Sequence, residues 1–111
     1  MLTTEKQLDE INRQSFDNHI TGIVLFKHST RCSISSMALN RIERSWDLQK
    51  ESVPIYYLDL LNYRDISEKI AQIYSLLHQS PQILVIKNGK CIYNASHSEI
   101  SVHNIKIAIN S

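Results

Sequence analysis

The Asn88-Gly89 pair constrains the fold of this chain more than any other feature of the sequence. It separates two β-prone runs, residues 82–87 and 90–95. Asparagine followed by glycine between such runs is the strongest short-range signal for a two-residue turn joining antiparallel strands. We therefore predict a β-hairpin in the C-terminal half of the chain.

Two further β-prone runs predict the remaining strands. Residues 22–27 are almost continuously apolar, which is typical of a strand covered on both faces in a parallel arrangement, and we expect it at the centre of the sheet. Residues 53–61 predict the other strand, because Pro54 is tolerated at a strand start where no ladder donor is needed.

Four segments show the apolar spacing of amphipathic helices. We expect a first helix over residues 4–18, a second starting close to Cys32, a third over 64–78 that must end before Pro81, and a last one starting at Ser98 as its N-cap. The apolar residues that define these four stripes are Leu8, Ile11 and Phe16; Ile34, Ala38, Ile42 and Trp46; Ile66, Ile70, Ile73, Tyr74 and Leu77; and Val102, Ile105 and Ile109.

The order of these elements, α-βαβ-αββα, predicts the fold class. It is typical of a thioredoxin-like α/β domain, with a four-stranded mixed sheet flanked by helices and one added N-terminal helix. The length of 111 residues fits a single domain over 1–111.

Charge and composition exclude several classes of function. Twelve basic residues nearly balance eleven acidic ones and are scattered singly, so we expect neither nucleic acid nor a membrane surface as partner. The first residues lack the apolar core of a signal peptide, and this favours a cytoplasmic protein. The five histidines show no ligand spacing, so we expect no metal site.

Cys32 is the candidate nucleophile. It lies between the central strand and the start of a helix, where free backbone N–H groups and the positive end of the helix dipole favour a thiolate. We expect Arg31, with Lys27 and His28, to add positive potential, so that the pKa of Cys32 falls below that of a free thiol. The alternative is a small buried apolar residue, which is what a free cysteine often is.

The residues around Cys32 predict a monothiol route. Ser35 lies three residues later on the same helical face, where its hydroxyl can donate a hydrogen bond to the thiolate but cannot form a disulfide. Cys91 follows the hairpin turn, roughly 15 to 20 Å from Cys32, whereas a disulfide needs Cα atoms within about 7 Å. We therefore interpret Cys91 as structural.

Three segments, residues 26–35, 63–67 and 80–90, together resemble the YtxJ family of monothiol bacilliredoxins. Their sequences are FKHSTRCSIS, YRDIS and SPQILVIKNGK. The resemblance implies a thioredoxin fold and removal of bacillithiol from mixed disulfides on client proteins through Cys32, with Ser35 where dithiol relatives have their second cysteine. The family motif usually reads Thr-Cys-Pro-Ile-Ser, whereas this chain has Arg31 and Ser33 on either side of the cysteine. These departures leave glutathione or another small thiol open as the co-substrate.

The resemblance also implies the remaining site residues and the partners. In the thioredoxin class the proline that corresponds to Pro81 is cis, and the backbone before it, here Ser80, pairs with an extended client segment. We expect Arg31, Ser33, Ser80 and Pro81 to contact the substrate, with no bound cofactor and with S-thiolated proteins as clients. The alternative is a thioredoxin-like protein-binding module whose cysteine does not turn over. The oligomeric state is left open.

Overall fold

The strands form one mixed sheet, in the order β2-β1-β3-β4. They are β1 (Ile23–His28), β2 (Ile55–Asp59), β3 (Gln82–Lys87) and β4 (Lys90–Ser96). β1 is parallel to β2 and antiparallel to β3, which is antiparallel to β4. The structure, a computed structural model, describes residues 2–29, 33–46, 52–96 and 99–110. The predicted four-stranded mixed sheet, with β1 in its interior, is confirmed.

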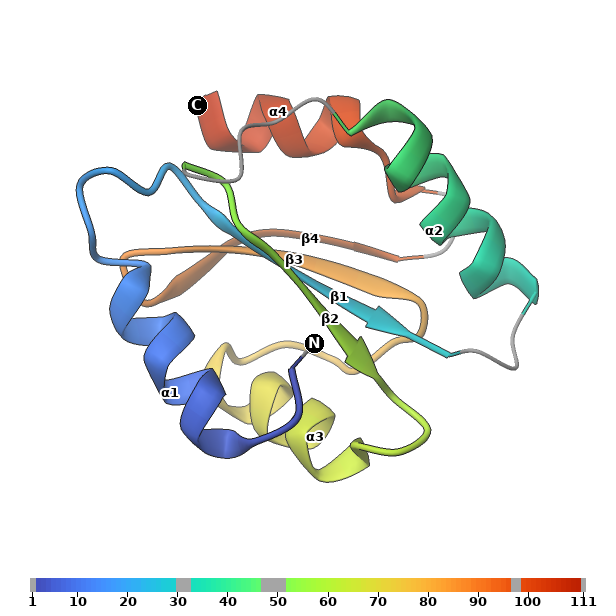
Figure 1. Cartoon of the computed structure of the whole chain (residues 1–111), viewed down its shortest axis with the longest axis horizontal. Coiled ribbons are helices and arrows are strands. Elements are labelled where there is room, and N and C mark those ends of the chain that lie inside the picture. The colour runs from blue at the N-terminus through green and yellow to red at the C-terminus, as the bar shows by residue number, and fades with distance from the viewer. Residues whose placement is uncertain (1, 30–32, 47–51, 97–98, 111) are drawn as a thin grey trace.

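Helices cover both faces of the sheet (Figure 1). α1 (Glu5–Gln14) and α3 (Arg64–Ile73) lie on one face, and α2 (Ser33–Ser45) and α4 (Val102–Asn110) lie on the other. Strand side chains alternate between these faces. One core cluster therefore lies between the sheet and α1 and α3, and a second lies between the sheet and α2 and α4.

The first helix is shorter than its sequence pattern predicts. It begins after Thr4, whose hydroxyl accepts a hydrogen bond from the Gln7 amide in a capping box, and it ends at Gln14 instead of residue 18. Phe16 is 57% exposed, so its assignment to the buried stripe is wrong. Its ring lies beside Gly89, where an added Cβ would be 2.7 Å from Phe16 Cζ.

The third helix also ends early. α3 stops at Ile73, and Ser75 takes a φ of 53°, a left-handed conformation that does not continue a helix. Leu77 is 82% exposed and Ile73 is 38% exposed, so neither completes the predicted stripe. The chain then runs without helix to Pro81.

The last helix begins later than predicted. α4 starts at Val102, and the Ser101 hydroxyl accepts a hydrogen bond from the Asn104 amide at 3.1 Å, as an N-cap does. Ser98, the predicted cap, lies outside the described residues. Val102 and Ile105 are buried, which confirms the inner face of this helix.

The predicted hairpin is confirmed. Asn88 and Gly89 have φ angles of 53° and 73°, the positive values that a tight two-residue turn requires.

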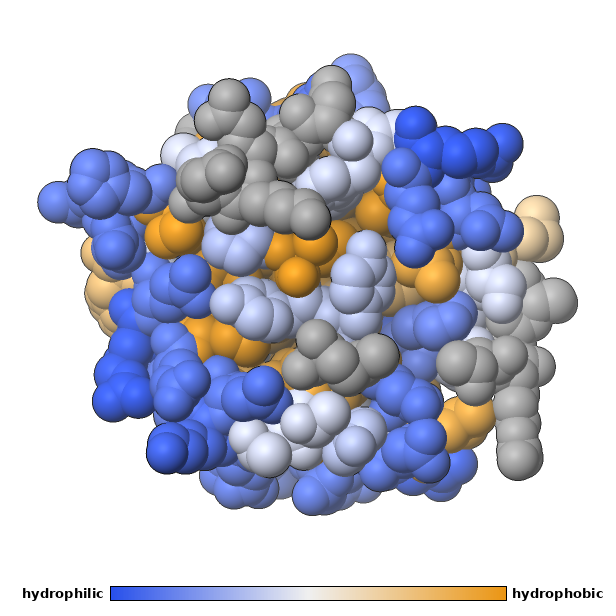
Figure 2. All heavy atoms as spheres, viewed as in Figure 1, coloured by the Kyte–Doolittle hydropathy of each residue, from blue (hydrophilic) through white to orange (hydrophobic). Residues whose placement is uncertain are grey.

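On the face shown in Figure 2, which β2 crosses, hydrophilic side chains gather toward the periphery and apolar side chains appear in smaller areas between them. In the described part of the chain, none of the helices has the length and apolarity that a membrane span needs.

Candidate active site

The junction between β1 and α2 contains the predicted nucleophile. β1 ends at His28, and α2 begins at Ser33, the residue that directly follows Cys32. Arg31 and Cys32 themselves lie outside the described residues, as does the side chain of Ser33. The residues on either side of Cys32, at the end of β1 and in the first turns of α2, are held by contacts that the structure does describe.

Ser35 ties the first turn of α2 to the end of β1. Its side chain is completely buried. Its hydroxyl oxygen accepts a hydrogen bond from the Ser29 amide at 3.0 Å and lies 2.6 Å from His28 Nδ1. When Nδ1 carries the imidazole proton, the Ser35 hydroxyl proton is free for another acceptor, such as a thiolate; when Nδ1 is unprotonated, that proton goes to the ring. His28 therefore governs whether Ser35 can serve in the predicted role.

The two basic residues at the end of β1 lie in different surroundings. Burial lowers the pKa of His28 below its usual value, against the opposing influence of Asp59 and Glu43. This lowered pKa favours the neutral form of the ring and so weakens the positive potential expected from His28. Lys27 projects from β1 toward α3, on the other face of the sheet, where its ammonium donates to the Ser67 carbonyl at 3.3 Å.

Pro81 lies at the same end of the sheet as the start of α2. Its peptide bond with Ser80 is cis, and its side chain is buried. The next residue, Gln82, pairs with Lys27 near the end of β1. The Gln82 side chain is itself buried and donates to the Leu77 carbonyl at 3.0 Å, which fixes the segment before the proline.

A buried polar cluster next to these residues was not predicted from the sequence. Lys27 is completely buried, and its ammonium contacts the Ser67 carbonyl and, at 3.2 Å, His78 Nδ1. Burial lowers the pKa of Lys27 to about 8, and burial together with the Lys27 charge lowers the pKa of His78. The available signal was a lysine within an otherwise apolar strand, but its partners are far away in the sequence.

Cys91 lies at the other end of the sheet. It pairs with Ile86, which pairs with Ile23, the first residue of β1. The five steps from Ile23 to His28 span about 17 Å at the usual strand rise. Burial raises the pKa of the Cys91 thiol, whose sulfur donates to the Tyr93 carbonyl. These features support a structural role for Cys91.

Within the described segments, no three His, Cys, Asp or Glu side chains are grouped to hold a metal ion.

Comparisons with known proteins agree with this architecture. A solved structure described as a proposed oxidoreductase with a thioredoxin fold is 28% identical, with a TM-score of 0.76 over 96% of this chain and 89% of that one. The thioredoxin of Malassezia sympodialis is 16% identical, with a TM-score of 0.72 over 98% of this chain and 85% of that one. A mutant thioredoxin from Halobacterium salinarum is 9% identical, with a TM-score of 0.71 and the same coverage. The predicted thioredoxin-like fold is confirmed.

The family comparison is more specific than the fold. The family model for the monothiol bacilliredoxin BrxC matches residues 1–105. This match includes both sides of the β1–α2 junction and the Ser80-Pro81 pair. The chain therefore belongs to the monothiol bacilliredoxin family, which connects it with the bacillithiol system.

Proposed function

We propose that this protein is a monothiol thiol-disulfide oxidoreductase that removes bacillithiol from mixed disulfides on client proteins through Cys32. The observation that carries the proposal is that α2 begins at the residue directly after Cys32, at the same end of the sheet as Pro81. Free amide groups and the dipole at a helix start favour a thiolate, the form that attacks disulfides. Family membership supports the same assignment.

The exchange proceeds in two balanced steps. The Cys32 thiolate attacks the bacillithiol sulfur of the mixed disulfide, the client sulfur leaves as a thiolate, and Cys32 now carries bacillithiol. A second small-thiol thiolate then attacks the bacillithiol sulfur bound to Cys32, forms a disulfide with it and releases the Cys32 thiolate. In the net reaction the client sulfur is reduced to a thiol, one free small thiol is consumed and joins the released bacillithiol in a disulfide, and no metal or nucleotide takes part.

The neighbouring residues have supporting roles in this scheme. The Ser80 backbone, before the cis bond, is suited to pair with an extended client segment, as in the thioredoxin class. Ser35 donates its hydroxyl proton to the thiolate when His28 Nδ1 carries the ring proton. Arg31 and Ser33 flank the cysteine in sequence and are proposed to contact the substrate.

A purified client that carries bacillithiol on one cysteine tests the proposal. We expect the wild-type protein and Cys91→Ser to release bacillithiol, measured by mass spectrometry of the client, and Cys32→Ser to release none. Alkylation by iodoacetamide against pH, in Cys91→Ser, should give a midpoint well below the ~8.5 of a free thiol. A midpoint near that value together with no release would instead identify a protein-binding module. A client that carries glutathione, tested in parallel, determines which small thiol is used.

A further inference from the structure

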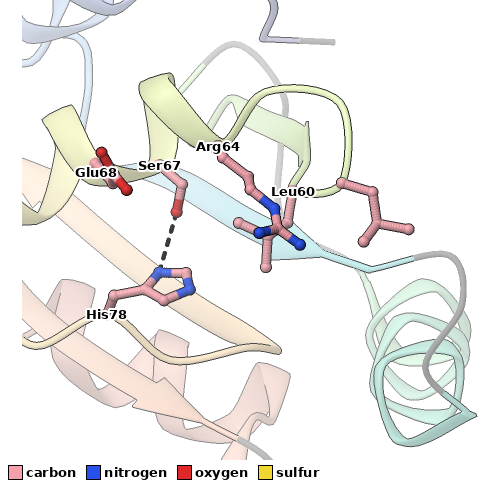
Figure 3. A pocket seen from close by; sticks show the side chains of 6 residues that line it. Leu60, Arg64, Ser67, Glu68 and His78 are labelled. Carbon is pink, nitrogen blue, oxygen red and sulfur yellow. Dashed lines mark hydrogen bonds between the residues drawn. The ribbon is translucent and has the colours of Figure 1, made fainter.

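A pocket of about 320 Å³ lies beside the end of β1 (Figure 3). Its walls come from the segment after β2, from the first turns of α3 and from the segment before Pro81. The Leu60 amide donates to the His28 carbonyl at 2.9 Å, which attaches one wall to the strand end that leads to Cys32. The lining residues are Leu60, Leu61, Arg64, Ser67, Glu68 and His78.

The polar groups of this pocket are mainly donors and cations. Arg64 extends from the start of α3, and Ser67 and His78 face each other at 3.1 Å between the Ser67 hydroxyl and Nδ1 (Figure 3). Lys27 lies completely buried behind these two residues and contacts both. Among the described residues that line the pocket, Glu68 is the single acidic one. The positive charges of Arg64 and Lys27 together therefore exceed the negative charge of Glu68.

We infer that this pocket binds a carboxylate group of the small thiol, and this inference rests on the proposed function. An arginine guanidinium binds a carboxylate through paired, charge-assisted hydrogen bonds. Bacillithiol and glutathione, the two small thiols considered above, both carry carboxylates. The pocket is attached to the strand end before Cys32 and to the segment before Pro81, so a thiol exchanging at Cys32 would bring its anionic part to this place.

The buried lysine contributes long-range attraction to this site. Its ammonium donates to one carbonyl and one imidazole, which leaves its charge uncompensated by those two partners. Burial lowers its pKa to about 8, and a carboxylate arriving in front of Ser67 and His78 would raise that pKa again. Leu60 and Leu61 supply an apolar wall on one side, and apolar surroundings strengthen such charge interactions.

The test measures binding without thiol exchange, in full-length Cys32→Ser protein. Succinate is the probe, and its uncharged analogue succinamide is the control ligand. We expect succinate to shift the imidazole NMR signals of His78 in a saturable way, and succinamide not to do so. Arg64→Gln should weaken succinate binding by about tenfold, the usual effect of losing one charge-assisted pair. Glu68→Gln should strengthen it, because a like charge is removed.

A matched control keeps the result specific. Lys69 is an exposed cation on α3 that does not line the pocket, so Lys69→Gln should leave succinate affinity unchanged. Equal weakening by Arg64→Gln and Lys69→Gln, or no saturable shift, would overturn the inference even if the wild-type protein removes bacillithiol. Specific succinate binding with no bacillithiol release would instead contradict the proposed function alone.

Discussion

The two ends of the sheet each use a completely buried serine, but they surround it with different chemistry. At the hairpin end, the Ser15 hydroxyl accepts from the Gly89 amide and donates to the Asn12 carbonyl, so both partners are backbone groups. At the other end, the Ser35 hydroxyl contacts the Ser29 amide and the titratable His28 ring. One end has a fixed proton arrangement, and the other can change it.

The two ends of the sheet also differ in how deeply each buries the charge of a lysine. At the hairpin end, the Lys87 ammonium contacts the carbonyls of Asp17 and Ile20, and this residue is only partly buried. At the end next to Cys32, the Lys27 ammonium is completely buried beside a histidine, and its pKa is lowered to about 8. We therefore interpret the hairpin end as a part of the molecule that stabilises the fold. The end next to Cys32 is less favourable for stability, because it buries the charge of Lys27 and alters its pKa.

Gly89→Val should give the largest loss of stability and should leave bacillithiol release unchanged. The substitution places a β-branched residue at a φ of 73° and brings its Cβ against Phe16. We expect about 2 kcal/mol lower free energy of unfolding by urea denaturation, with bacillithiol release unchanged under conditions where the protein is folded. A comparable loss of release rate would show that the two ends are coupled.

Lys27→Met should change stability in the opposite direction. Replacing a buried charge by an apolar side chain of similar length is expected to raise the free energy of unfolding at pH 7 by about 1 to 2 kcal/mol. Between pH 8 and 10.5, the folded wild-type protein loses the Lys27 proton while the unfolded chain keeps it, so wild-type stability from this group rises with pH.

The pH dependence of that variant provides the control. The gain from Lys27→Met should shrink as pH rises from 8 to 10.5, measured by urea denaturation at each pH. A gain that stays constant across this window would contradict the lowered pKa. A loss of stability at pH 7 would show that the two hydrogen bonds of Lys27 matter more than the burial of its charge.

The paired variants Ser15→Ala and Ser35→Ala compare the two ends directly. Each leaves a backbone amide without its acceptor, so each should lower the free energy of unfolding by about 1 to 2 kcal/mol. Only Ser35→Ala should also slow bacillithiol release and shift the pH midpoint of Cys32 alkylation upward. If Ser35→Ala released bacillithiol as fast as Ser15→Ala, Ser35 would have a structural role alone.

Cys91 should give the smallest effect, seen only in its reactivity. Burial raises the pKa of its thiol, so in Cys32→Ser protein it should react with iodoacetamide several-fold more slowly at neutral pH than a free cysteine. Unfolding in urea should remove this protection. Equal rates in the folded and unfolded protein would show that the thiol is accessible and would reopen its interpretation as structural.

Local sequence patterns were sufficient for the element order. Asn88-Gly89 determines its turn through the conformations of those two residues alone, and the apolar run of β1 requires burial wherever it lies. Helix ends were less predictable. The apolar spacing continues through Phe16 and Leu77, but both side chains are exposed because the chain leaves the helical conformation before them.

The sequence by itself determined the thioredoxin-like order of strands and helices and predicted the start of a helix close to Cys32. Only the tertiary structure decided the surroundings of that position, including the Ser35 contact with His28 and the burial of Lys27 against Ser67 and His78. Strand and helix signals arise between residues a few positions apart, and a single sequence displays them. Lys27 meets partners 40 and 51 positions away, and such contacts exist only once the sheet and helices have packed.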